Sequence, residues 1–157
     1  MNTILRLGVY DSPGVLDRIA GLIRRNGFNI TSINAGRSKG GVSQISIVLD
    51  DERIDVGKLG QQLVDINFIS EYRVLGDDNA CIRELALLRM RAADFDAAYF
   101  RDAKILERDA REISFELTGA PRDIDALLLP VQDRLLDVVR SGALAISGKG
   151  TDANESV

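Results

Sequence analysis

Residues 10–34 read YDSPGVLDRIAGLIRRNGFNITSIN. This stretch predicts the end of a strand, a tight turn, an amphipathic helix and the start of a second strand. Its apolar residues repeat at helical spacing and form one stripe: Val15, Leu16, Ile19, Leu22 and Ile23. Ser12 is a candidate N-cap with Pro13 at the first helical position, and Gly27 can end the helix in a left-handed conformation. The chain is therefore expected to begin with a β–α–β unit.

The turn before this helix could hold a carboxylate ligand. A helix N-terminus carries N–H groups without intrahelical partners and a partial positive charge. Asp11, Ser12 and Gly14 lie there, and Gly14 would let a ligand approach the backbone. Asn29 opens the next strand and could supply an amide to the same ligand. A plain helix cap explains the turn as well, so the residues alone leave both interpretations open.

Runs of β-branched and apolar residues predict four strands for the first unit: residues 4–10, 28–35, 42–49 and 68–75. A second helix is predicted over residues 55–66. The resulting order is βαββαβ, which is the ferredoxin-like split βαβ arrangement. The polar, turn-rich residues that follow mark its end. We therefore expect a first domain at residues 1–76 and a linker at residues 77–81.

A second α+β unit is predicted over residues 82–150. Its expected elements follow roughly the same order: a strand at 82–90, a short helix at 93–100, strands at 104–109 and 112–118, a helix from Pro121 and a strand at 135–147. Pro130 should end or kink the second helix, because proline lacks an N–H group and clashes with the preceding turn. Residues 151–157 are predicted to form a disordered tail. The chain is therefore expected to be an α+β protein of two related units.

The composition excludes several classes of function. The 157 residues carry a net charge of −4 without a basic stripe, so nucleic acid is not an expected partner. The chain contains no histidine, which excludes Ser-His and Cys-His dyads and histidine-ligated zinc; no metal site is expected. The single Cys81 excludes an internal disulfide and fits a cytoplasmic location. Neither a signal peptide nor an apolar run of about 20 residues that could span a membrane is predicted.

Motifs in both units resemble those of one known family. Residues 11–30 resemble the first ACT domain of the regulatory small subunit of acetohydroxyacid (acetolactate) synthase. In the second unit, Arg83–Leu88 is similar to the family's R-E-L-x-L-[IL] strand and Phe100–Ile105 to its F-R-x-x-I block. Phe115–Gly119 contains its E-L-T-G motif, and Val139–Gly142 is similar to its closing R-[ST]-G strand.

The resemblance covers residues 3–150 and implies a regulatory subunit without an active site of its own. Its partner would be a ThDP-dependent catalytic subunit that condenses pyruvate with pyruvate or 2-ketobutyrate, and ThDP, Mg²⁺ and FAD would be held by that partner alone. The small subunit would form a homodimer through its ACT domains, activate the enzyme and convey feedback inhibition, usually by valine. The effector would bind at the ACT interface to residues of the turn and the following strand: Asp11, Ser12, Gly14, Val15, Asn29 and Ile30.

Three positions depart from the family pattern. Asp11 stands where the family usually has Asn, and an ionised carboxylate cannot donate to an effector carboxylate, so Asp11 would have to face the ammonium group. Ser43–Ser46 lacks the Arg of the family's S-R-M-T strand, and Asp65 replaces a Lys. These changes predict a divergent member whose effector or sensitivity differs. The alternative function is a stand-alone ACT amino-acid sensor that regulates a different enzyme.

Overall fold

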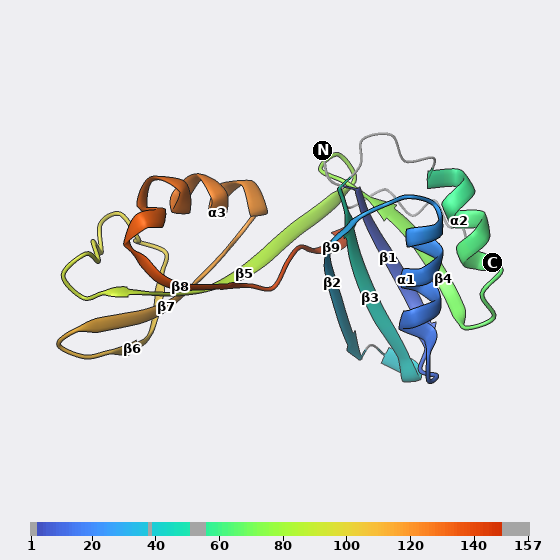
Figure 1. The fold of residues 1–157 in the computed structure, drawn as a ribbon, viewed down its shortest axis with the longest axis horizontal. Coiled ribbons are helices and arrows are strands. Elements are labelled where there is room, and N and C mark those ends of the chain that lie inside the picture. The colour runs from blue at the N-terminus through green and yellow to red at the C-terminus, as the bar shows by residue number, and fades with distance from the viewer. Residues whose placement is uncertain (1–2, 38, 51–55, 149–157) are drawn as a thin grey trace. The chain divides into compact units, whose positions relative to one another are not determined.

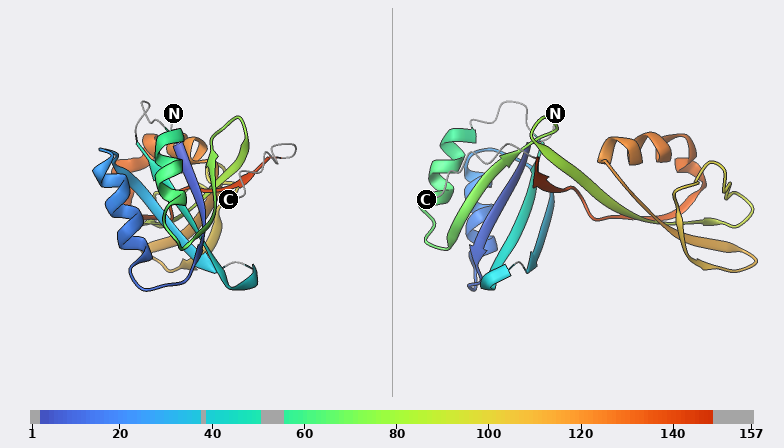
Figure 2. Two further views of the ribbon diagram at one scale, coloured as in Figure 1. Left: turned by 90° about the vertical axis from the view of Figure 1, so that its right-hand side faces the viewer. Right: turned by 180° about the vertical axis from the view of Figure 1, so that it is seen from behind.

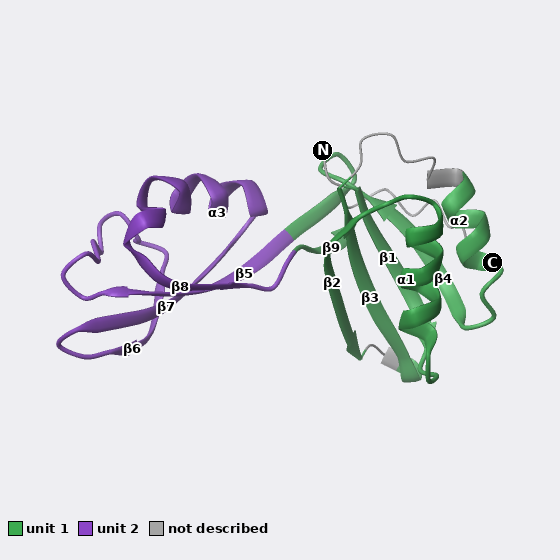
Figure 3. Cartoon of the chain, in the orientation of Figure 1, with its two compact units in different colours: residues 1–82, 143–157 green, residues 83–142 purple. Residues whose placement is uncertain are grey.

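The computed structural model describes residues 3–37, 39–50 and 56–148, and the chain divides into two units (Figure 3). Residues 1–82 together with 143–157 form the first unit, and residues 83–142 form the second. Both units pair antiparallel strands with helices, which confirms the predicted α+β class.

The first unit contains a four-stranded antiparallel sheet in the order β2-β3-β1-β4 (Figure 1). Its described elements are β1 (Thr3–Tyr10), α1 (Val15–Arg25), β2 (Ile30–Arg37), η1 (Lys39–Gly41), β3 (Val42–Leu49), α2 (Val56–Val64) and β4 (Ile69–Leu75). Their order along the chain is the predicted βαββαβ. The predicted strand at 42–49 is confirmed at both ends, whereas the strand predicted from residue 28 begins at Ile30.

Helices α1 and α2 cover one face of this sheet (Figures 1 and 2). Alternate residues of each strand point to the same face, so one set of strand residues meets the helices. The resulting core consists mainly of branched aliphatic side chains: Leu5, Leu7, Val9, Val15, Ile19, Leu22, Ile23, Ile45, Ile47, Leu49, Leu59, Leu63 and Ile69. The helical stripe predicted for α1 is therefore confirmed except at Leu16, which is 44% exposed.

A second, smaller cluster lies on the opposite face of the same sheet. Ile4, Val48 and Leu75 alternate with the core residues of their strands and are buried together with Ala143. Ala145, in β9 (Leu144–Ser147), also packs against this cluster. Residues 143–147 therefore return to the first unit, where Ala143 and Ala145 cover part of the sheet.

This return changes the predicted domain boundaries. Residues 77–81, which were expected to form a linker, form a turn that runs directly into a strand beginning at Ala80. The turn is closed by a hydrogen bond in which the Oδ1 atom of Asn79 accepts the Gly76 N–H at 2.8 Å. The units divide between Ile82 and Arg83, and the second unit ends at Gly142 rather than at residue 150. The tail predicted at residues 151–157 lies outside the described residues.

The start of α1 also differs from the prediction. Neither Ser12 nor Pro13 is helical; Gly14 is the N-cap, with a left-handed φ of 82°, and no side-chain cap is present among the described residues. The Ser12 carbonyl instead accepts the N–H of Val15 at 3.2 Å, which closes a turn before the helix. At the other end, Gly27 has a φ of 81°, as expected for a glycine that terminates a helix.

The second unit is built on a sheet in the order β6-β7-β5-β8. Its described elements are β5 (Ala80–Arg91), which starts in the first unit, β6 (Lys104–Arg108), β7 (Glu112–Gly119), α3 (Pro121–Leu128), η2 (Leu129–Arg134) and β8 (Leu135–Arg140). The helix predicted from Pro121 is confirmed, and Pro130 lies in the 3₁₀ turn that follows it. The core lies on the sheet face that carries Leu88 and Phe115, and Ile124 of α3 packs into it.

Two predicted elements of this unit are wrong. Residues 93–100 form turns rather than a helix, because Phe95 and Phe100 both pack against Phe115, with ring centroids 5.1 and 4.9 Å from it. The strand expected over residues 135–147 is divided into β8 and β9. Gly142, with a φ of 76°, lies between the two strands and allows the chain to turn there.

Two helical glycines give a matched test of how α1 and α2 pack in the first unit. A methyl group on Gly60 of α2 would lie 2.5 Å from the hydroxyl oxygen of Tyr72, whereas one on Gly21 of α1 would meet only the flexible Arg25 guanidinium at 3.4 Å. We expect Gly21→Ala to raise the free energy of unfolding by up to about 1 kcal/mol through helix propensity. Gly60→Ala should lower it by about 1 kcal/mol because the overlap exceeds that gain. Urea denaturation followed by circular dichroism measures both, and equal stabilisation by the two variants would contradict the packing.

Candidate functional site

The turn predicted to bind an effector lies where β1 gives way to α1. Asp11 and Gly14 are exposed, Ser12 is half-buried and Val15 is buried in the core. A Cβ built at Gly14 would have no atom within 4 Å, so the backbone at this N-cap position is open. The open backbone and the helix N-terminus together suit a small anionic group.

Arg18 adds a positive charge close to this turn. Its N–H donates to the Gly14 carbonyl at 3.1 Å, and its guanidinium lies 5.3 Å from the centre of the Phe68 ring. This cation–π contact holds the charge near the first turn of α1. The sequence alone does not single out Arg18, because Phe68 is distant in sequence and only the fold brings the two residues together.

Asn29 immediately precedes β2, and Ile30 is the first residue of that strand. The Asn29 side chain is exposed and its carbonyl accepts the N–H of Asp50 at 3.2 Å, whereas Ile30 is half-buried against the core. Asn29 is therefore fixed by its backbone while its amide group is free to face solvent.

The antiparallel register places Asn29 far from the turn within one chain. Tyr10, which precedes Asp11, lies opposite Val42 at one end of β3, whereas Asn29 bonds to Asp50 just past the other end. The eight residues of β3 separate these two levels by about 26 Å at the usual rise of a strand. Within a single chain Asn29 therefore does not lie beside the turn, and no small ligand spans the distance between them.

The strand that follows Asn29, β2, forms an edge of the sheet. Among the described residues, β2 pairs only with β3, so its outer backbone groups face away from the sheet. Residues 30–36 contain neither a charged side chain nor proline, the usual features that keep an edge strand from pairing with another chain. Ile33, on the helix-covered side of β2, and Leu16 of α1 are each 44% exposed. This edge is therefore suited to contact a second molecule.

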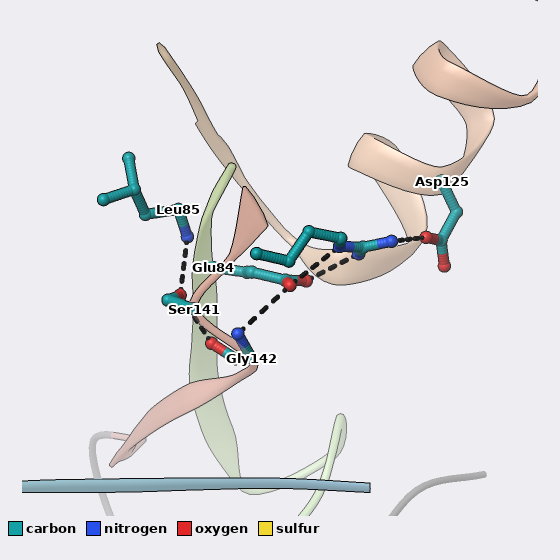
Figure 4. Close-up of polar contacts among 6 residues, drawn as sticks. Glu84, Leu85, Asp125, Ser141 and Gly142 are labelled. Atoms are coloured by element: carbon teal, nitrogen blue, oxygen red, sulfur yellow. Dashed lines mark hydrogen bonds and ion pairs between the residues drawn. The ribbon is translucent and has the colours of Figure 1, made fainter. Parts of the chain in front are cut away.

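In the second unit, a charged cluster joins the start of β5 to the end of β8 (Figure 4). Glu84 is 6% exposed, and its two carboxylate oxygens accept from the Nε and one Nη atom of Arg140 at 2.8 and 2.7 Å. The other Nη atom of Arg140 donates to Asp125 of α3. The bond to Glu84 is the main cause that raises the pKa of Arg140 above its ordinary value, so Arg140 stays charged.

The residues after Arg140 extend this cluster along the backbone. The Ser141 hydroxyl accepts the Leu85 N–H at 3.1 Å, and the Gly142 N–H donates to the Glu84 carboxylate at 3.3 Å (Figure 4). Glu84, Arg140, Ser141 and Gly142 belong to the two sequence motifs that open and close the second unit. The motifs were visible in the sequence, but their pairing was not, because 56 residues separate Glu84 from Arg140.

The described residues contain no cluster of side chains that could bind a metal ion. In residues 3–37, 39–50 and 56–148, no three His, Cys, Asp or Glu side chains gather where they could hold a metal ion. The same part of the chain has no helix that is long and apolar enough to cross a membrane.

The ferredoxin-like unit with its open glycine turn defines an ACT-domain protein. A family model described as the AHAS small subunit-like ACT domain matches residues 5–70. The acetolactate synthase small subunit of Mycobacterium leprae is 30% identical over 147 residues, which cover 88% of this chain and 87% of that protein. The Mycobacterium avium protein of the same name is 32% identical over 127 residues, 76% of each chain. This chain belongs to the family of acetolactate synthase small subunits.

A solved structure agrees over both units. The crystal structure of the acetolactate synthase small subunit from Thermotoga maritima matches with a TM-score of 0.81 and 25% sequence identity, covering 94% of this chain and 98% of that one. The likeness therefore extends beyond the first unit to the second, where the predicted motifs lie.

The charged cluster of the second unit gives a test of stability. We expect Glu84→Gln to lower the free energy of unfolding by about 1–3 kcal/mol, because it removes the buried carboxylate that is the main counter-charge of Arg140, whose side chain is 34% exposed. Asp125→Asn removes the other carboxylate of the same arginine, but Asp125 is 62% exposed and should cost less than about 1 kcal/mol. Chemical denaturation of both variants measures the difference, and an equal loss would contradict the assigned roles.

Proposed function

We propose that this chain is the regulatory subunit of an acetolactate synthase, which activates a catalytic subunit and conveys feedback inhibition by valine or a related amino acid. Family membership and the likeness over both units support this role. ThDP, Mg²⁺ and FAD would be held by the catalytic partner. The chain itself would supply the effector site and the surface that contacts that partner.

The effector site is, in this proposal, shared by two copies of the chain. If two β2 edges pair antiparallel about a two-fold axis, the start of each strand lies beside the end of the other. Asn29 stands at the start of β2, and the Asp11–Gly14 turn lies at the end of the sheet where β2 finishes. The homodimer would thus bring Asn29 of one copy to the turn of its partner, which a single chain cannot do.

The chemistry of the two halves fits an amino acid. The effector carboxylate would lie at the N-terminus of α1, where the helix dipole and Arg18 favour negative charge. Asp11 would face the ammonium group, because an ionised carboxylate there repels the effector's own. Burial of a valine-sized side chain contributes about 1.5–3 kcal/mol, and the effector would shift the enzyme only through unequal affinity for its two states.

Substitutions at either half should separate activation from inhibition. We expect Gly14→Asp and Asn29→Ala each to abolish valine inhibition while activation of the catalytic subunit persists. Gly14→Asp adds a negative charge where the effector carboxylate would lie, and Asn29→Ala removes the amide from the other half. Asn34→Ala in the same strand is the matched control, because its Nδ2 atom is buried and makes no hydrogen bond within the described residues. Valine titration of the reconstituted enzyme measures all three, and full sensitivity of both site variants would contradict the assignment.

Mixed dimers test whether two copies share the site. A dimer of one Gly14→Asp chain and one Asn29→Ala chain keeps one intact site, made from the normal turn of one copy and the normal Asn29 of the other. Random mixing of the two variants should therefore restore about a quarter of the wild-type binding capacity, measured by calorimetry. A site contained within one chain would bind nothing in the mixture.

Reconstitution tests the regulatory role itself. The purified chain should raise the turnover of a ThDP-dependent acetolactate synthase catalytic subunit from the same cells and should copurify with it. If the chain binds an amino acid but neither copurifies with that subunit nor changes its turnover, the alternative of a separate amino-acid sensor is correct.

A further inference from the structure

Two arginines lie side by side on the face of the first sheet that α1 and α2 do not cover. Arg6 of β1 and Arg73 of β4 are direct partners in the antiparallel register, so their side chains point to the same face. Ile4 and Leu75, each two residues away, belong to the cluster opposite the helices, which identifies that face. Like charges directly opposite each other destabilise a sheet. This arrangement is therefore more favourable when an anion lies beside it.

The carboxylate in the next row of the register does not pair with Arg6. Glu71 lies opposite Gly8, and a Cβ built at Gly8 would come 2.7 Å from the Glu71 Cγ atom, so the Glu71 side chain covers that glycine. On the other side of Gly8, Gln44 donates from Nε2 to Glu71 at 3.4 Å and accepts from the Arg6 Nε atom at 3.0 Å. Within the described residues, Arg6 makes no other hydrogen bond and no ion pair. A neutral amide therefore holds the half-buried guanidinium, and its two Nη groups keep their donors for a ligand.

Other donors lie on either side of Arg6 in the same row. Ser46 of β3 is its register partner on one side and is 7% exposed. On the other side, Arg73 donates from Nη1 to the Ser147 hydroxyl at 3.2 Å, which holds its guanidinium on this face beside β9. Three neighbouring strands span about 10 Å, which two arginine side chains can reach across. One small anion above Arg6 could therefore accept from both arginines and from the Ser46 hydroxyl.

We propose that Arg6, Arg73 and Ser46 form a binding site for a doubly charged oxyanion of the phosphate type. Guanidinium groups present paired N–H donors that match the oxygens of such an anion. A dianion attracts each positive charge about twice as strongly as a monocarboxylate at the same distance does. The site lies on the sheet face opposite α1, so it is separate from the effector turn and does not depend on the proposed regulatory role.

Calorimetry with inorganic phosphate, at constant ionic strength and with the full chain, tests this site. We expect Arg6→Gln and Arg73→Gln each to raise the Kd for phosphate at least about tenfold, because each removes one guanidinium. Arg24→Gln is the control, because it removes the same charge from an exposed position at the end of α1. Its Kd should match that of the wild-type chain. Acetate, which carries one charge, should bind the wild-type chain at least about tenfold more weakly than phosphate.

Urea unfolding separates binding from a purely structural role of Arg6. Without phosphate, Arg6→Gln should unfold at the same urea concentration as the wild-type chain or at a higher one, because the like-charge pair is removed. Phosphate should raise the midpoint of the wild-type chain and leave that of Arg6→Gln nearly unchanged, since only a folded chain with the site binds the anion. An arginine that acted only through structure would lose stability in both buffers.

Three results would each overturn the proposal. The first is an unchanged Kd for phosphate in Arg6→Gln, and the second is acetate binding as tight as phosphate binding. The third is loss of phosphate binding in Gly14→Asp but not in Arg6→Gln, which would assign the anion to the turn before α1. Because neither valine nor the catalytic subunit enters these measurements, the regulatory role can fail or succeed independently.

Discussion

The antiparallel register of the first unit's sheet determines where the two halves of the candidate site lie. Strand β3 pairs with β1 on one side and with β2 on the other, which holds the turn after β1 and the residue before β2 at opposite ends. Hydrogen bonds along three strands keep that separation, and a small ligand cannot bridge it. A site that uses both Asp11 and Asn29 must therefore come from two chains, and the unprotected β2 edge is suited to join them.

Each of the two units contains contacts between residues that are far apart in the sequence. Ala143 and Ala145 return to the first sheet after the whole second unit and bury Ile4 and Leu75. Just before these residues, Arg140 donates two hydrogen bonds to Glu84 at the start of the second unit. A bidentate pair of this kind fixes the direction of the two side chains as well as their distance.

Much of the fold could be predicted because its signals are local. Alternation along residues 42–49 and 112–118 predicts strands, and the glycine after Arg25 and Asn26 predicts the end of α1. The failures involve contacts with distant residues. Phe95 and Phe100 form turns because they pack against Phe115, and residues 144–147 pair with a strand more than fifty residues earlier in the chain. The candidate site residues could be proposed from the sequence, but the distance between them could not, because register is a property of paired strands.

The central claim, that the effector site joins two chains, can be measured by nuclear magnetic resonance with mixed isotope labels. Equal amounts of ¹⁵N-labelled and ¹³C-labelled chain, mixed so that dimers exchange and then saturated with valine, would be examined for nuclear Overhauser effects between chains. The account predicts contacts between the Gly14 amide of one chain and Asn29 of the other. If Gly14 and Asn29 show such contacts only within one chain, or show none between chains while valine is bound, the proposal of a shared site is wrong.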